Sequence, residues 1–92
     1  MIIRIERSGG VSGIPLQKTI NSNALSKNKT EEIHTIIEKT NFFHLSSQYT
    51  ESNVRDTFQY TITVQAESHT HSVTFDEDRL PKELHPLIKS FT

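Results

Sequence analysis

The sequence predicts an α+β fold, with a four-stranded antiparallel sheet and two helices in the order ββαββα. One main helix and a short C-terminal helix are expected to pack on one face of the sheet. Two observations carry this prediction. Residues 57–66 alternate apolar and polar side chains, which is typical of a half-buried strand. Residues 26–40 carry isoleucines at helical spacing. A chain of 92 residues is expected to form a single domain spanning residues 1–92.

The first two predicted strands form a long hairpin. Residues 2–7 (IIRIER) place Ile3 and Ile5 on one face of a strand. Residues 16–21 (LQKTIN) predict the second strand, and the glycine-containing segment between the two strands joins them.

The main helix is predicted to begin after Ser26, a residue type that favours the N-cap, and to run to about Thr40. Its apolar stripe consists of Ile33, Ile36, Ile37 and Thr40. Phe42 and Phe43 follow the helix, and at least one of them is expected to enter the core. Residues 46–56 are polar and lack periodicity, so they predict a loop.

The last part of the chain predicts a second hairpin and a short helix. Residues 57–66 and 69–76 read as its strands, joined by a turn at Glu67 and Ser68. Pro81 suits the first turn of a helix, and Pro86 in the second turn should keep that helix short or kinked. The apolar stripe of this helix consists of Leu84, Leu87, Ile88 and Phe91.

The uncovered face of the predicted sheet should be polar. A solvated face is the favoured interpretation, and a partner-binding face is the alternative. Its predicted residues are Arg4, Glu6, Gln59, Thr61, Thr63, Thr70, Ser72 and Thr74.

Composition excludes several function classes. The net charge is −1 with scattered cations, so no basic footprint for nucleic acid is visible. There is no cysteine, which excludes disulfides and cysteine-based zinc sites. No apolar run is long enough for a signal peptide or a membrane span, so a cytoplasmic protein that does not contact membranes is expected.

The sequence holds no recognisable catalytic constellation, so we expect no enzyme, no catalytic residue and no cofactor. The G-V-S-G stretch lacks the spacing of a nucleophile elbow, and it lacks the lysine and following helix of a phosphate-binding loop. His69 and His71 would share one face of a strand and could contribute to a metal site, but no third ligand is identifiable. A half-buried or edge histidine is therefore favoured, and no metal is expected.

All three glycines lie between Gly9 and Gly13, around Val11. Glycine accepts positive φ and lets a backbone approach another surface closely, but a hairpin needs only one or two such residues. One interpretation is a turn whose geometry requires glycine. The other is a projecting segment that lies in a partner's cleft, with Val11 filling an apolar pocket. The residues alone support a binding module without naming its partner.

Four segments resemble the emfourin family, small bacterial proteins that inhibit M4 metallopeptidases, the thermolysin-like zinc enzymes such as protealysin. The first is I-x-R-I-E-R-S-G-G-V-S-G-I, from Ile2 to Ile14. The others are N-F-F-H-L at 41–45, F-Q-Y-T-I-T-V at 58–64 and L-H-P-L-I at 84–88. The resemblance covers nearly the whole chain in order.

The resemblance implies an inhibitor of an M4 peptidase. We hypothesise that it binds one peptidase molecule as a monomer and that the glycine-containing loop blocks the active-site cleft. Thermolysin-like enzymes carry zinc at the bottom of a cleft beside an apolar pocket, which Val11 would fill, while Arg7 anchors the base of the loop. The inhibitory loop would comprise Arg7, Ser8, Gly9, Gly10, Val11, Ser12, Gly13 and Ile14.

A loop this small cannot cover a whole interface, so secondary contacts are expected. Tyr49 and Arg55 are residue types that anchor interfaces. The amino group of Met1 is an alternative group to approach the zinc. Two rival classes stay open: a non-inhibitory interaction domain of the same fold, and a small metal- or ligand-binding protein that uses His69 and His71.

Overall fold

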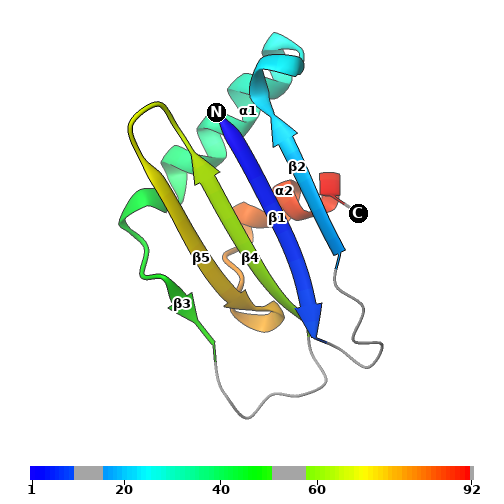
Figure 1. The fold of residues 1–92 in the computed structure, drawn as a ribbon, viewed down its shortest axis with the longest axis vertical. Coiled ribbons are helices and arrows are strands. Elements are labelled where there is room, and N and C mark those ends of the chain that lie inside the picture. The colour runs from blue at the N-terminus through cyan, green and yellow to red at the C-terminus, as the bar shows by residue number, and fades with distance from the viewer. Residues whose placement is uncertain (10–15, 51–57, 92) are drawn as a thin grey trace.

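A computed structural model gives the structure of the chain, and it describes residues 1–9, 16–50 and 58–91. In these ranges the chain forms five strands and two α-helices, connected by short 3₁₀ turns (Figure 1). The strands are β1 (Ile2–Gly9), β2 (Leu16–Asn21), β3 (Gln48–Tyr49), β4 (Phe58–Gln65) and β5 (Thr70–Asp76). The helices are α1 (Lys27–Lys39) and α2 (His85–Phe91).

The strands form one sheet in the order β2-β1-β4-β5-β3. Both predicted hairpins are confirmed, because β1 pairs with β2 and β4 pairs with β5, each in antiparallel register. The two hairpins join through antiparallel pairing of β1 with β4, which places Ile5 opposite Ile62. The most regular strand in the sequence, β4, is therefore the middle strand of the sheet.

The predicted count of four antiparallel strands is wrong, because the sheet is mixed and has a fifth strand. Strand β3 lies inside the predicted loop 46–56 and pairs with β5 in parallel. The Thr74 amide donates to the Ser47 carbonyl at 2.9 Å, and the Tyr49 ring stacks on Phe75. A two-residue strand is too short to show alternation, so only contacts with the distant β5 produce it.

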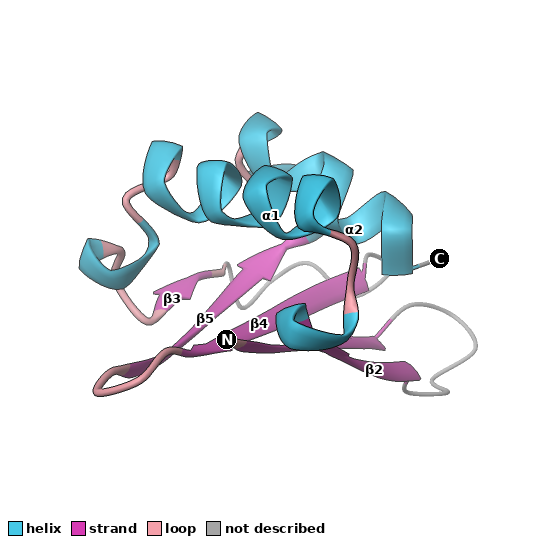
Figure 2. Ribbon diagram, turned by 90° about the horizontal axis from the view of Figure 1, so that it is seen from above, coloured by secondary structure: helices cyan, strands magenta, loops and turns pink. Residues whose placement is uncertain are grey.

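The structure has two layers, with both helices on one face of the sheet (Figure 2). The core lies between the layers, and its strand residues are the alternating apolar ones that the sequence indicates. Among the described residues, the buried core consists of Ile3, Ile5, Ile33, Ile37, Phe42, Tyr60, Ile62, Val64, Val73, Phe75, Leu84, Leu87 and Ile88.

Helix α1 begins and ends where its sequence predicts. The Ser26 hydroxyl accepts a hydrogen bond from the Lys29 amide at 3.3 Å, which satisfies one of the unpaired amides of the first turn. Asn41 follows the helix with a φ of 53°, in the left-handed region that asparagine tolerates. This turn directs Phe42 into the core, where its side chain is fully buried.

Helix α2 is short, as expected, but it begins later than Pro81. Pro81 precedes the 3₁₀ turn Lys82–Leu84, and the α-helix starts at His85. Pro86 therefore lies in the first turn, not the second, where its missing amide breaks no helical hydrogen bond. The side chain of Phe91, the last residue of the predicted stripe, is outside the part of the chain that the structure describes.

The uncovered sheet face is polar, as predicted. Thr61 bonds to Thr74 at 3.0 Å, and Thr63 bonds to Ser72 at 2.7 Å. These cross-strand pairs tie β4 to β5 without an apolar patch. At the end of β5 the Asp76 carboxylate is fully buried and accepts a hydrogen bond from the Gln59 side chain at 3.2 Å.

Candidate partner-binding end

The predicted inhibitory loop is only partly within the described residues. Its positions Gly10, Val11, Ser12, Gly13 and Ile14 lie outside them, while Arg7, Ser8 and Gly9 form the end of β1. Gly9 pairs with Phe58, the first residue of β4, and Arg7 pairs with Leu16, the first residue of β2. The ends of three strands therefore meet at one end of the sheet (Figure 1).

Gly9 is the glycine whose conformation is described. Its φ of 82° lies in the left-handed region, which costs glycine nothing and most other residues about 1 kcal/mol or more. Ser8 and Gly9 are both exposed while remaining paired with β4. Strand β1 thus ends in an exposed residue that turns the chain out of the extended conformation.

Arg7 lies on the helical face of β1, as alternation from Ile3 and Ile5 requires. Its guanidinium carbon stands 4.4 Å from the centre of the Phe58 ring, a cation–π contact. Its Nε atom is buried and has no hydrogen-bond partner. The side chain therefore joins the end of β1 to the start of β4.

The side chain of Tyr49, a predicted secondary contact, contacts other residues of the protein itself. Its ring stacks on Phe75 with the centroids 5.3 Å apart and the planes 10° from parallel. Its hydroxyl accepts a hydrogen bond from the Ser46 amide at 3.0 Å. Arg55, the other predicted secondary contact, lies outside the described residues.

Met1 lies at the opposite end of β1 from the loop. Its carbonyl accepts a hydrogen bond from the Ser22 amide at 3.0 Å, which fixes the backbone of the first residue. The eight residues of β1 lie between Met1 and the loop positions that follow Gly9, and at about 3.4 Å per residue they span roughly 27 Å. Met1 therefore lies far from Gly9, the last described residue of the loop.

His69 and His71 do not form a free ligand pair. The Nε2 atom of His71 lies 2.7 Å from the Leu45 carbonyl oxygen, so this nitrogen donates a hydrogen bond. The ring also meets Phe42 edge to face. His69 is exposed beside Phe43. Nowhere in the described ranges do three metal-ligating side chains gather.

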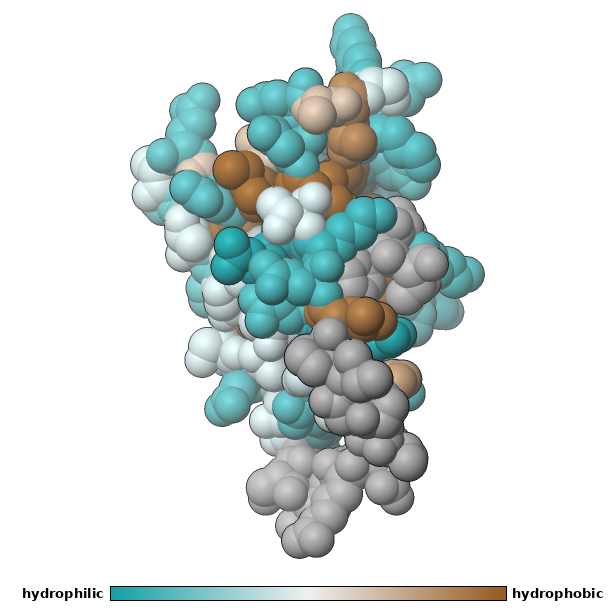
Figure 3. Space-filling view, turned by 45° about the vertical axis from the view of Figure 1, so that its right-hand side comes forward, coloured by the Kyte–Doolittle hydropathy of each residue, from teal (hydrophilic) through white to brown (hydrophobic). Residues whose placement is uncertain are grey.

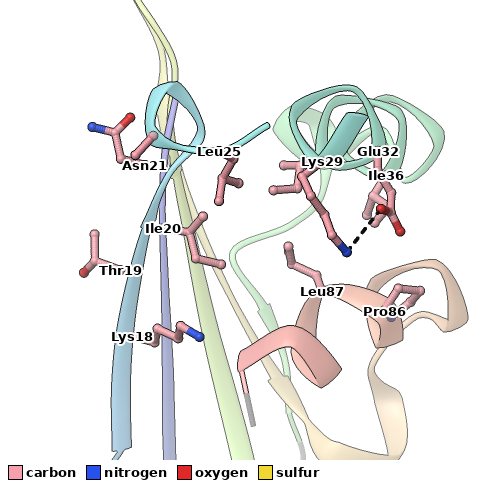
Figure 4. A pocket seen from close by; sticks show the side chains of 12 residues that line it. Lys18, Thr19, Ile20, Asn21, Leu25, Lys29, Glu32, Ile36, Pro86 and Leu87 are labelled. Atoms are coloured by element: carbon pink, nitrogen blue, oxygen red, sulfur yellow. Dashed lines mark ion pairs between the residues drawn. The ribbon is translucent and has the colours of Figure 1, made fainter. Parts of the chain in front are cut away.

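Sequence reasoning missed a cavity of about 400 Å³ between β2, α1 and α2 (Figure 4). Apolar side chains form most of its lining, among them Ile20, Ile36 and Leu87. Leu25, which is 37% exposed, stands at the same cavity. Leu25 belongs to neither of the two predicted apolar helix stripes. A leucine outside both stripes was the sequence signal that could have indicated this cavity.

The described residues form a small α+β domain in which the ends of three strands meet at one end of the sheet. None of the described helices is long and apolar enough to cross a membrane. The chain belongs to the Emfourin family, whose sequence model matches residues 5–92. That family is one of metallopeptidase inhibitors, which fits a non-enzymatic role. No curated protein and no solved structure matches the chain.

Proposed function

We propose that this protein inhibits a thermolysin-like M4 zinc metallopeptidase, binding one peptidase molecule as a monomer and blocking its active-site cleft with the loop from Arg7 to Ile14. The family match carries this proposal. It covers residues 5–92, and so includes the whole loop, the loop-side part of β1 and all of β2. Val11 is the residue that enters the apolar pocket beside the zinc.

The described base of the loop supports this mechanism. Arg7 is held over Phe58, and Gly9 is paired with Phe58 across the strands. Leu16, the first described residue after the loop, is paired with Arg7, so strand residues on both sides of the loop are held in the sheet. Fixed flanking residues reduce the conformational freedom lost on binding, and this raises affinity. The preorganised end of the sheet therefore suits insertion into a cleft.

The test is a titration of thermolysin with the protein, followed by cleavage of a chromogenic peptide. Activity should fall linearly and reach zero at one equivalent. Added zinc separates inhibition from chelation: it leaves a cleft-blocked enzyme inactive but restores an enzyme stripped of its metal. Full activity at excess protein would favour the non-inhibitory interaction domain, and rescue by zinc would favour the metal-binding protein.

An extension of the N-terminus by two residues should leave the inhibition constant unchanged within about twofold. Met1 lies at the opposite end of β1 from the loop, and its carbonyl is bonded to the Ser22 amide. The extended and the original chain are compared in the same peptide-cleavage assay. A large loss of inhibition in the extended chain, with unchanged thermal stability, would assign the zinc contact to the Met1 amine.

A further inference from the structure

Strand β2 forms one edge of the sheet, and its hydrogen-bonding pattern can be followed residue by residue. The Ser22 amide donates to the Met1 carbonyl, and these two residues are directly opposite in the β1–β2 register. In an antiparallel ladder, opposite residues alternate between bonded and non-bonded pairs. Leu16, Lys18 and Ile20 therefore bond to β1.

Between them, Gln17, Thr19 and Asn21 turn their backbone N–H and C=O groups away from β1. The other ladders agree with this assignment. The Ala66 amide donates to the His69 carbonyl, which directs the even-numbered residues of β4 toward β5 and the odd-numbered ones toward β1. No described strand lies beyond β2. Gln17 and Thr19 thus offer open backbone donors and acceptors at this edge, and Asn21 offers its amide, because its carbonyl accepts the first hydrogen bond of the 3₁₀ turn Ser22–Ala24.

The cavity between β2, α1 and α2 adjoins this edge. Ile20 and Lys18 point toward it, while Thr19 points to the other face (Figure 4). Apolar surface lies between polar residues when this side of the molecule is turned forward (Figure 3). Leu16 shares a face of β2 with Lys18 and Ile20, and its side chain is 43% exposed. A strand added beside β2 would place alternate side chains at the mouth of the cavity.

We propose that β2 binds an extended segment of the target peptidase as an added strand of the sheet, with an apolar side chain of that segment at the cavity. This inference rests on the proposed function and supplies the second contact that the loop requires. A tight protease–inhibitor interface buries about 800 Å² per partner. Of the two residues expected to supply it, Tyr49 is stacked on Phe75 and bonded to Ser46, and Arg55 lies outside the described residues.

The continuity of the chain identifies the occupant. Leu16 begins β2 and pairs with Arg7, so the edge strand starts at the base of the loop. A peptidase that holds the loop therefore lies next to β2. The opposite edge lacks this continuity and is partly covered, because β3 pairs with β5 at Thr74 and Phe75.

Amide hydrogen exchange followed by NMR tests the added strand without any substitution. On binding of thermolysin, the amides of Gln17, Thr19 and Asn21 should exchange at least about tenfold more slowly. The amides of Lys18 and Ile20, already bonded to β1, should change little. Contact by the loop alone would not produce this alternation along β2, so its absence in an inhibited complex overturns the inference.

A Thr19→Pro substitution removes one outward amide and leaves the β1–β2 hydrogen bonds intact, a position where edge strands tolerate proline. The inhibition constant should rise about tenfold or more. Thr70→Pro is the matched control, because Thr70 is exposed and its amide points outward at the opposite edge. It should change inhibition less than about twofold.

The outcomes separate the two proposals. If the unaltered protein does not inhibit, the proposed function fails. If it inhibits and both proline variants inhibit equally well, the loop mechanism stands and the role of β2 is wrong. If alternate protection of β2 appears in the free protein as its concentration rises, the edge pairs with a second copy, and assignment to the peptidase is overturned.

Discussion

A Val11→Asp substitution should raise the inhibition constant against thermolysin by about 100-fold or more. An apolar pocket that accepts valine must instead take up a carboxylate, and burial of an unpaired charge costs several kcal/mol. A rise of 100-fold corresponds to about 2.7 kcal/mol, well within that cost. Thermal unfolding should be unchanged, because a residue that fills the partner's pocket contributes to binding and not to the fold of the free protein.

The control for the added charge is Ser68→Asp, which changes the net charge equally at an exposed turn between β4 and β5. This turn lies at the end of the sheet opposite Gly9, so its effect on inhibition should be less than about twofold. Inhibition by the Val11→Asp variant as strong as that of the unaltered protein would assign the loop a purely structural role.

A Phe42→Ala substitution should lower the free energy of unfolding by about 3–5 kcal/mol. The Phe42 side chain is 0% exposed and meets the rings of Phe43 and His71 edge to face. Its removal leaves a cavity where the end of α1 joins the sheet. The total free energy of unfolding of a native protein is about 5–15 kcal/mol. The variant should therefore unfold at a much lower urea concentration.

Phe43→Ala serves as the comparison, because Phe43 is adjacent in sequence but only half-buried. The Phe43→Ala substitution should lower the free energy of unfolding clearly less than Phe42→Ala does. Equal losses for the two variants would contradict the assignment of Phe42 as the core residue of this pair. Urea unfolding followed by circular dichroism measures both.

The elements with strong local patterns were predictable from the sequence. Phe58, Tyr60, Ile62 and Val64 alternate with polar residues and form β4. Ser26 caps α1, and its isoleucine stripe faces the core. In both cases the apolar residues that become buried recur at a regular spacing within one short segment. Hydrophobic periodicity is therefore sufficient to predict the element.

The candidate site was predictable in part. The glycines marked the loop, and the structure adds that Gly9 is left-handed and that Arg7 is held over Phe58. The contact between Arg7 and Phe58 joins residues about fifty positions apart, and it follows from the β1–β4 register. No local pattern contains that register, because it depends on which strands become neighbours.

By itself, the sequence determined the two hairpins, the main helix and the polar character of the uncovered sheet face, because alternation and capping act between near neighbours in the chain. Only the tertiary structure decided that Gln48 and Tyr49 pair with β5, that His71 bonds to Leu45, and that β2 is left with an open edge. These features depend on which segments, far apart in the chain, are brought side by side when the core is buried.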